Sequence, residues 1–281
     1  LRITKSSMGT FDWCPKQYWF QNVKGMRGDE VYYHTRGKNV HDVVEYFWDN
    51  VDDVLPDVLK CIEEGRSEQA RGLLYDVIPQ PSDSYAYGEE EQIRKWVDWQ
   101  YNRLVITKGK NWKPVGIEAN IHATRIVEVD GTPIPIHMRG YIDTIFNTGE
   151  GGFALMELKS GKWKKGKKKD MRKEMQFYRM MLEHSPHHEF LPITHWGWEF
   201  PGGNIEGGEG THSYYEDVKK DRSSPSKVEN TLVSIVKAHI NDDYPMTGAN
   251  GWYNAKLNRF QTKCEWCDFM DVCPNFAPEE I

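Results

Sequence analysis

Four of the five cysteines lie near the two ends of the chain, so a site that uses all four requires the fold to bring those ends together. Cys14 stands alone near the start, and Cys264, Cys267 and Cys273 form the pattern C-x2-C-x5-C. An odd number of cysteines does not suit a disulfide framework, and a two-residue spacing is typical of metal ligation. Four thiolates hold either Zn²⁺ or an iron–sulfur cluster, and spacing alone does not choose between them. The fifth, Cys61, is expected in the core.

Composition excludes several classes of protein. The 281 residues are 38% hydrophobic and 28% charged, which is typical of a globular chain with a sizeable core. No apolar run is long enough to cross a bilayer, and no secretory signal is visible, so we expect a cytoplasmic protein without a membrane partner. A net charge of -6 excludes nucleic-acid binding through overall positive charge, although a local basic groove remains compatible with it.

The periodicity of apolar residues predicts an α/β or α+β fold, with a mixed central sheet flanked by helices. A first helix, capped by Ser6 or Ser7, is expected to run to Asn22. Further helices are expected at 35–51, 57–64, 67–77, 89–108, 170–183 and 226–241. Strands are expected at 115–127, 134–146, 153–160, 193–200 and 212–215. We expect one domain over 1–281, with a helical part at 1–112, a core at 113–242 and an irregular cysteine tail at 243–281.

Two neighbouring strands carry a carboxylate and a carboxylate-x-lysine pattern. If the loop 147–152 turns at Glu150, Asp143 falls opposite Glu157, and Lys159 shares the face of Glu157 because side chains alternate along a strand. Two converging carboxylates would bind Mg²⁺ or Mn²⁺, and the lysine would orient a water or stabilise charge on a phosphate. An ordinary cross-strand ion pair is the alternative. The apolar neighbours of Glu157 argue against it, because burying charge without a function is costly.

Two more side chains are candidates for the same centre. His41 lies in an apolar helical stripe, where it would be either a core residue or a further metal ligand. Glu118 lies between apolar residues of a strand, where it would be either an accessory ligand or an edge charge.

A basic cluster follows Lys159 directly. Eight basic residues and a single acid, Asp170, occupy positions 162–173 in an otherwise acidic chain. This asymmetry favours phosphate contacts over a merely solvated loop. Gln176 and Tyr178, on the helix that follows, are candidate DNA contacts, although Tyr178 also suits the core. The candidate DNA-binding lysines are Lys162, Lys164, Lys165, Lys167, Lys168 and Lys169.

Together these residues resemble the RecB-type PD-(D/E)XK nucleases that carry an iron–sulfur staple, which include the AddB nuclease domain and CRISPR-associated RecB-like exonucleases. The opening from Ser6 to Tyr18 is similar to the family's N-terminal cysteine motif, and the terminal cysteines match its C-x2-C-x5-C. The family's helical histidine, motif II aspartate and E-x-K are matched by His41, Asp143 and Glu157-Leu158-Lys159.

One motif departs from the family's pattern. Gln176 matches the start of Q-x3-Y, but Met180 stands at the tyrosine position, and Tyr178 comes two residues early.

The resemblance implies a PD-(D/E)XK core closed by a 4Fe–4S cluster rather than zinc. It implies that the cluster is held by Cys14, Cys264, Cys267 and Cys273. It also implies metal ligation by His41, Asp143, Glu157 and the backbone carbonyl of Leu158, with Lys159 catalytic. The family's histidine is associated with exonucleolytic members, so end-dependent cleavage is implied.

The sequence therefore predicts a Mg²⁺- or Mn²⁺-dependent DNA exonuclease that acts on single strands or DNA ends. The settings compatible with it are repair, recombination, phage replication and CRISPR adaptation. No P-loop or helicase motif is present, so duplex unwinding would need a helicase or a CRISPR or recombination partner. A non-catalytic DNA-binding subunit with a structural Fe–S or zinc clasp is the alternative. An electron-transfer protein is a third class, but such a protein does not need an E-x-K pattern beside a lysine cluster.

Overall fold

The computed structural model describes residues 1–28, 32–79, 88–161, 165–203, 212–248, 251–254 and 259–274. The chain forms two compact units, each assembled from separate segments. The first unit contains Leu1–Glu30, Ala123–Arg139 and Pro225–Ile281, and the second contains Val31–His122 and Gly140–Ser224. This division differs from the consecutive parts expected from the sequence, because both termini belong to one unit.

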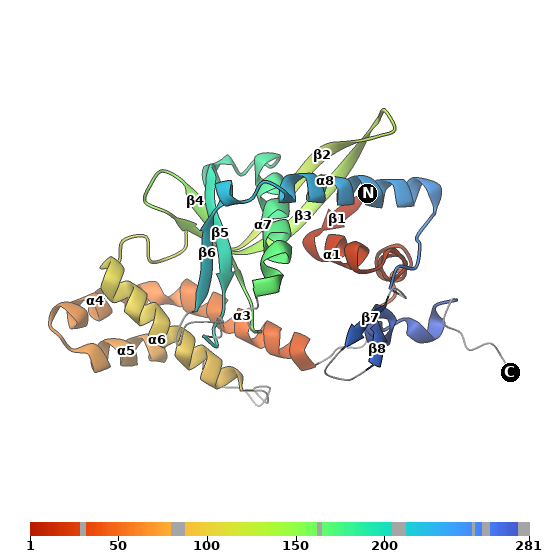
Figure 1. Ribbon diagram of the computed structural model, residues 1–281. Coiled ribbons are helices and arrows are strands. Elements are labelled where there is room, and N and C mark those ends of the chain that lie inside the picture. Colours follow the sequence, from red (N-terminus) through yellow and green to blue (C-terminus); the bar gives the residue numbers. More distant parts are fainter. Residues whose placement is uncertain are drawn as a thin grey trace. The chain divides into compact units, whose positions relative to one another are not determined.

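A mixed sheet of six strands runs through the fold (Figure 1). Its strands are β1 (Arg2–Thr4), β2 (Gly116–Val129), β3 (Thr132–Asn147), β4 (Phe153–Leu158), β5 (Ile193–Glu199) and β6 (Ser213–Asp217). Their order is β1-β3-β4-β5-β6, and β2 pairs with β3. The β1–β3 and β4–β5 pairs are parallel, whereas β3–β4 and β5–β6 are antiparallel. The predicted mixed sheet flanked by helices is confirmed, although the short strand β1 was not predicted.

The turn between β3 and β4 has the predicted register. Thr144 pairs with Met156 and Asn147 with Phe153, so the same register places Asp143 opposite Glu157. Gly149 and Gly151 adopt φ values of 77° and 80°, a left-handed conformation that glycine enters without steric penalty. This hairpin brings the two predicted carboxylates to one end of adjacent strands.

Four helices of the second unit cover one face of its strands (Figure 1). They are α3 (Tyr32–Asn50), α4 (Leu55–Glu63), α5 (Ser67–Asp76) and α6 (Glu89–Thr107), with the 3-10 turn η2 (Val51–Asp53) between α3 and α4. Trp48, Trp96 and Trp112 are fully buried in this core, with Ala154 and Met156 from β4. Cys61 of α4 lies in the same core, as expected.

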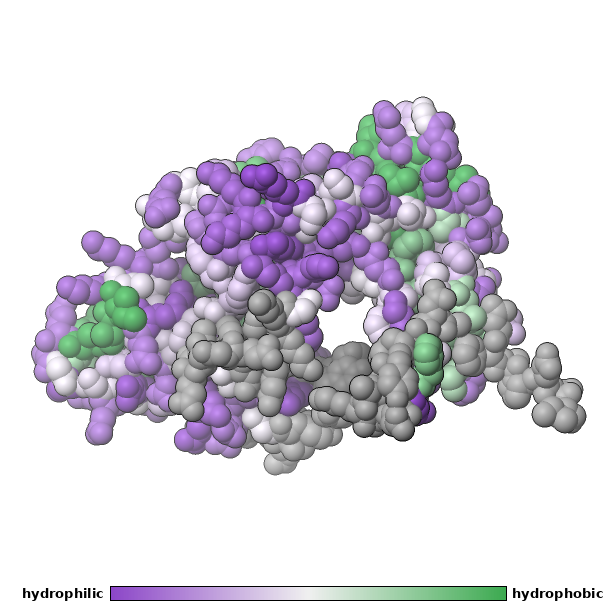
Figure 2. All heavy atoms as spheres, in the orientation of Figure 1, coloured by the Kyte–Doolittle hydropathy of each residue, from purple (hydrophilic) through white to green (hydrophobic). Residues whose placement is uncertain are grey.

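Helix α7 (Lys168–Glu183) packs against β5 on the other side of these strands (Figure 1). The 3-10 turn η3 (Lys165–Lys167) precedes α7, and η4 (His188–Phe190) follows it. A further 3-10 turn, η5 (Val218–Lys220), follows β6. The surface around α7 and β4–β6 is mostly hydrophilic (Figure 2). Beneath it, the buried carboxylate of Glu216 on β6 accepts hydrogen bonds from Arg172 at 2.5 and 2.8 Å, Tyr214 at 3.0 Å and Trp196 at 3.3 Å.

Replacing Glu216 with glutamine should destabilise the second unit by about 3 kcal/mol at neutral pH, because it removes one member of a buried, hydrogen-bonded ion pair. Burial opposes ionisation, but the partners led by Arg172 lower the pKa of Glu216 from 4.5 to about 2. The ionised carboxylate therefore contributes stability above about pH 4.5, and that contribution is lost as the pH falls toward 2. Urea unfolding should show a large difference from the unmodified protein at pH 7, a reduced one near pH 3 and a small one near pH 2.

The exposed residue Glu183 pairs with Arg179 one turn away on α7 and provides the control. Glu183→Gln should change the free energy of unfolding by less than about 0.5 kcal/mol. Equal effects of the two variants at pH 7 would contradict the importance of the Glu216 network.

The first unit contains the two segments that carry the four terminal cysteines. Helices α1 (Lys5–Trp13), α2 (Pro15–Tyr18) and the π-helix η1 (Trp19–Val23) replace the single predicted helix. The chain is extended at Cys14 (φ −161°, ψ 116°), since Pro15 begins a new helix there. The N-cap is Thr4, whose side chain accepts from the Ser7 backbone, rather than Ser6 or Ser7.

The end of the chain is more regular than predicted. After α8 (Ser224–Asn241), β7 (Gly251–Asn254) and β8 (Arg259–Thr262) form a two-stranded antiparallel sheet. Two 3-10 turns, η6 (Lys263–Trp266) and η7 (Met270–Val272), follow and carry or flank the three cysteines. The predicted irregular tail is therefore wrong at these residues. Within the described ranges, no helix has the length and apolar character that a bilayer crossing requires.

Candidate metal centre and cysteine site

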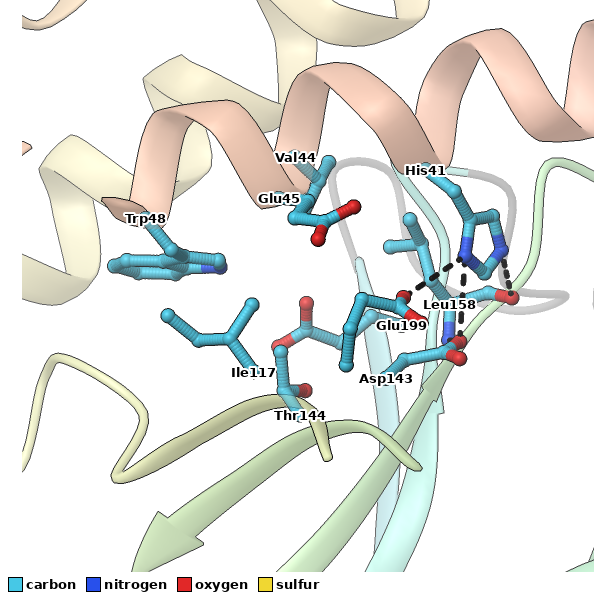
Figure 3. Close-up of a pocket in the computed structure, with 10 residues that line it drawn as sticks. His41, Val44, Glu45, Trp48, Ile117, Asp143, Thr144, Leu158 and Glu199 are labelled. Carbon is cyan, nitrogen blue, oxygen red and sulfur yellow. Dashed lines mark hydrogen bonds and ion pairs between the residues drawn. The ribbon is translucent and has the colours of Figure 1, made fainter. Parts of the chain in front are cut away.

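Three side chains from different elements converge at one end of the second unit's strands. His41 comes from α3, Glu118 from β2 and Asp143 from β3, and their potential ligand atoms all lie within 4.8 Å of one another. His41 Nδ1 is 3.7 Å from both Glu118 Oε1 and Asp143 Oδ2. Figure 3 shows His41 reaching from α3 toward Asp143 and Leu158, while Trp48 and Ile117 line the far side of the pocket. This cluster therefore contains Asp143 together with His41 and Glu118, for each of which the sequence left two roles open.

The peptide group of Leu158 orients two of these side chains. Its carbonyl oxygen lies 3.2 Å from His41 Nε2, and its N–H donates to Asp143 Oδ2 at 2.6 Å. A carbonyl only accepts, so Nε2 carries a proton toward Leu158, and Nδ1 faces the two carboxylates. These carboxylates favour a proton on Nδ1, and a bound cation would take the place of that proton. Nδ1 is therefore the histidine atom placed to bind a metal. The Leu158 carbonyl, which the resemblance implied as a further ligand, contacts His41 Nε2 in this structure and fixes the ring; its second lone pair leaves the predicted ligand role open.

The charge balance of this cluster suits a cation. Burial alone would lower the pKa of His41, but the hydrogen bond to Glu118 and the charges of Asp143 and Glu157 outweigh it and raise the pKa. The pKa of Glu45, one turn along α3, is raised by burial and by the charge of Glu118. Glu118 also has a left-handed φ of 43°, a strained conformation of the kind found at functional sites. Oxygen ligands with one imidazole fit a divalent ion.

Glu157 lies beside this cluster and binds the predicted catalytic lysine. Its side chain is 4% exposed, and its Oε1 accepts from Lys159 Nζ at 3.0 Å. Lys159 Nζ is also 3.2 Å from Glu174 Oε2 and lies 5.0 Å from the ring centre of Trp198. The three predicted residues of the hairpin therefore meet at one end of the strands, with the ammonium group held between two carboxylates. The three-residue ligand cluster itself does not include Glu157.

Helix α7 contributes Tyr178 and Glu174 to the site. Burial and the charges of Glu157, Asp143 and Glu174 raise the pKa of Tyr178 well above 10, so its hydroxyl stays protonated and hydrogen-bonds to Glu157. Glu174 precedes Tyr178 by four residues, so both share a helix face, whereas Gln176 lies on another face. Gln176 and Tyr178 are only 5% and 2% exposed. Glu174 was not among the predicted site residues, and its four-residue spacing to Tyr178 was the signal that could have revealed it.

An open groove of about 430 Å³ lies next to this site. His41, Glu157, Lys159 and Glu174 line it, and Lys167 and Asp170 lie on its wall. The groove lets a polymer backbone approach the lysine and the carboxylates.

The basic cluster is divided between two roles. Lys167 and Lys169 are exposed, and Lys167 lines the groove. Lys168 lies 3.2 Å from Glu216 Oε2, and Arg172 is bonded to the same carboxylate, so both stabilise the fold. The predicted contacts Lys162 and Lys164, and the side chain of Lys165, lie outside the described residues.

The four terminal cysteines all lie in the first unit, and Cys14 and Cys264 meet at Gly248. No disulfide involves any of the five cysteines of the chain. A Cβ atom built on Gly248 would lie 3.2 Å from Cys264 Sγ and 3.6 Å from Cys14 Sγ, so the glycine gives the two sulfurs room. Cys273 packs with Phe20 and Phe269, and Cys267 packs at the edge of this aromatic cluster. The predicted meeting of the two ends of the chain is therefore present in the structure.

The cysteine sulfurs influence one another's ionisation. Burial opposes ionisation of Cys14, but backbone hydrogen bonds led by those of Gln17 and Gly248 outweigh it and lower its pKa. Burial and the charges of Cys14, Cys267 and Cys273 raise the pKa of Cys264. Burial is also the main cause that raises the pKa of Cys267. Among the described residues, no three of the four sulfurs lie within 4.8 Å of one another. A set of four thiolates binds either Zn²⁺ or an iron–sulfur cluster in other proteins.

His41, Glu118 and Asp143 form a candidate site for a divalent metal, with Lys159 and Glu157 beside it. The chain belongs to the PD-(D/E)XK nuclease superfamily, whose family model matches residues 2–274. Among solved structures, the crystal structure of SSO0001 is similar at 15% sequence identity, with a TM-score of 0.34. That match covers 78% of this chain and 84% of the other. No curated protein matches the chain.

Proposed function

We propose that this protein is a Mg²⁺- or Mn²⁺-dependent DNA exonuclease that hydrolyses phosphodiester bonds in single strands or at DNA ends. One observation carries the proposal: Lys159 Nζ lies 3.0 Å from Glu157, beside a cluster in which His41, Glu118 and Asp143 point their ligand atoms at one another. Superfamily membership supports metal-dependent nuclease chemistry.

His41 Nδ1, Glu118 and Asp143 would hold the divalent ion, and Glu157 is proposed as a further ligand on the adjacent strand. When bound, the ion supplies an acidified water and positive charge beside the scissile phosphate. Leu158 holds Asp143 and the His41 ring in place through its N–H and carbonyl. Lys159 orients the attacking water or stabilises charge on the phosphate, and Glu157 and Glu174 keep its ammonium group in position.

The rest of the proposal concerns the substrate and the cysteines. The exposed side chains of Lys167 and Lys169 would contact the phosphate backbone near the groove, which makes binding sensitive to salt.

The four cysteines of the first unit would hold a 4Fe–4S cluster that joins the two terminal segments. Their proximity to one another and the backbone hydrogen bonds to Cys14 support such a cluster.

End-labelled linear DNA and covalently closed circles of the same sequence provide the test, in single- and double-stranded form, with Mn²⁺, Mg²⁺ or no divalent ion. The proposal expects metal-dependent release of short products from linear DNA, with circles degraded at least tenfold more slowly. Equal cleavage of circles would overturn end dependence. Retained DNA binding without cleavage under every metal condition would overturn the enzyme assignment and favour a non-catalytic DNA-binding subunit.

A further inference from the structure

A second hollow lies between α6 and the sheet, separate from the groove at Lys159. Its volume is about 400 Å³, and the small side chains of Ala154 and Ser213 leave the space on its sheet side. The size is typical of a site for a small molecule. Glu199 lines both this hollow and the pocket that contains His41. Nothing in the nuclease proposal uses this second space.

The guanidinium group of Arg103 is held in place in the hollow. Its Cζ lies 4.9 Å from the ring centres of both Trp99 and Phe146. Nη1 donates to Gln100 Oε1 at 2.9 Å and lies 3.8 Å from Glu199 Oε1, which is beyond hydrogen-bond distance. Among the described residues, Gln100 is its one hydrogen-bond partner, so most of its N–H groups remain available. A guanidinium fixed by two rings is prepared to bind a phosphate through paired hydrogen bonds.

Two loops supply further polar groups at the mouth of this hollow. The loop after α6 places Lys110 and Asn111 there, and the β3–β4 turn places Asn147 there. Asn111 has a left-handed φ of 51° and lies so close to Gly149 that a Cβ on this glycine would be 2.7 Å from its Nδ2. The two loops are thus in close contact, with strained backbone of the kind found at ligand sites.

An exposed aromatic ring completes the set. The ring of Tyr215 lines the hollow, is 48% exposed and stacks on His195 with a 4.8 Å centroid separation and a 2° interplanar angle. His195 supports the ring from one side. A stacked, supported ring of this kind is a platform for a planar base.

We propose that this hollow binds a nucleoside monophosphate. The phosphate pairs with Arg103 and Lys110, the side-chain amides of Asn111 and Asn147 contact the sugar, and the base lies against Tyr215. The charge of Arg103 and Lys110 selects the phosphate, and the aromatic and hydroxyl lining selects a base over a simple anion.

Isothermal titration of the full-length protein with dAMP, inorganic phosphate and deoxyadenosine tests this site. We expect dAMP to bind more tightly than either fragment. Arg103→Met should weaken dAMP binding at least tenfold, because it removes charge-assisted hydrogen bonds. Lys110→Glu should weaken it severalfold and is an exposed position, so the fold should tolerate it. Arg94→Met is the matched control on α6, since Arg94 is exposed and pairs with Glu90, and it should leave binding unchanged.

The Asp143→Asn variant tests whether dAMP binds in this hollow or at the nuclease centre. The variant should bind dAMP as the unmodified protein does, whether or not the protein cleaves DNA. Loss of binding in Asp143→Asn with retention in Arg103→Met and Lys110→Glu would place the nucleotide at the metal centre and overturn the proposal. Absence of dAMP binding at millimolar concentration, or equal affinity for dAMP and deoxyadenosine, would also overturn it.

Discussion

Lys159→Ala should reduce DNA cleavage about 10³-fold, as expected when a charge-stabilising group is removed from a phosphoryl-transfer site. The ammonium group is 3.0 Å from Glu157 and 3.2 Å from Glu174, at the edge of the open groove. The side chain is 27% exposed, so a substrate can reach it without unfolding of the site. Initial rates on end-labelled DNA at saturating Mn²⁺ measure the effect, because a defect in metal affinity alone would be corrected there.

Lys167→Ala is the matched control, since this lysine lines the same groove but has no partner role in the carboxylate cluster. We expect it to raise KM and reduce the salt dependence of binding, with kcat almost unchanged. Circular dichroism and thermal unfolding check that both variants are folded. If Lys159→Ala degrades DNA at the normal rate while folded, Lys159 is not a catalytic residue and the proposed chemistry is wrong.

The β3–β4 hairpin was predictable because its register depends on local features. Glycines at 149 and 151 fix the turn, and the two-residue period of the strands then fixes which side chains face one another. The pairs from Thr144–Met156 to Asn147–Phe153 confirm this reasoning. The short strand β1 was not predictable in this way, because its three residues pair with His137, Met138 and Arg139, far away in the sequence. Strand pairing over such separations leaves no local periodicity to detect.

The site shows the same contrast. Asp143 and Lys159 could be assigned from strand alternation, but the roles of His41 and Glu118 depend on how α3 and β2 approach β3. From the sequence, His41 suited the core at least as well as a metal site, and Glu118 suited a strand edge equally well. Their 3.7 Å approach favours the metal site and is visible only once the fold is known. Lys168 illustrates the converse, because it belongs to the basic cluster in sequence yet pairs with the buried Glu216 in the structure.

Cys264→Ser should remove the metal or cluster from the first unit and destabilise that unit by several kcal/mol. The four cysteines close a loop of about 250 residues, and a link of that length strongly restricts the unfolded chain. Next to the cysteines, Phe20, Phe269 and Cys273 form a small apolar cluster, whereas the main buried residues of the unit, such as Leu232 and Ile235, belong to α8. We therefore expect ligand binding to stabilise mainly the segments around the cysteines, as it does in small metal-bound folds.

Metal analysis and visible absorption after anaerobic purification measure the first effect, and limited proteolysis measures the second. A 4Fe–4S cluster predicts iron, sulfide and a brown colour in the unmodified protein, whereas a zinc site predicts one Zn²⁺ and no colour. In Cys264→Ser, proteolytic cleavage should begin within residues 1–30 and 225–281 while the second unit resists.

Cys61→Ala is the control. Cys61 lies in the core of the second unit, so this variant should leave metal content unchanged. A Cys264→Ser protein with full metal content and normal protease resistance would show that the four sulfurs do not share a ligand. The raised pKa of Cys264 would then reflect burial among other thiols and nothing more.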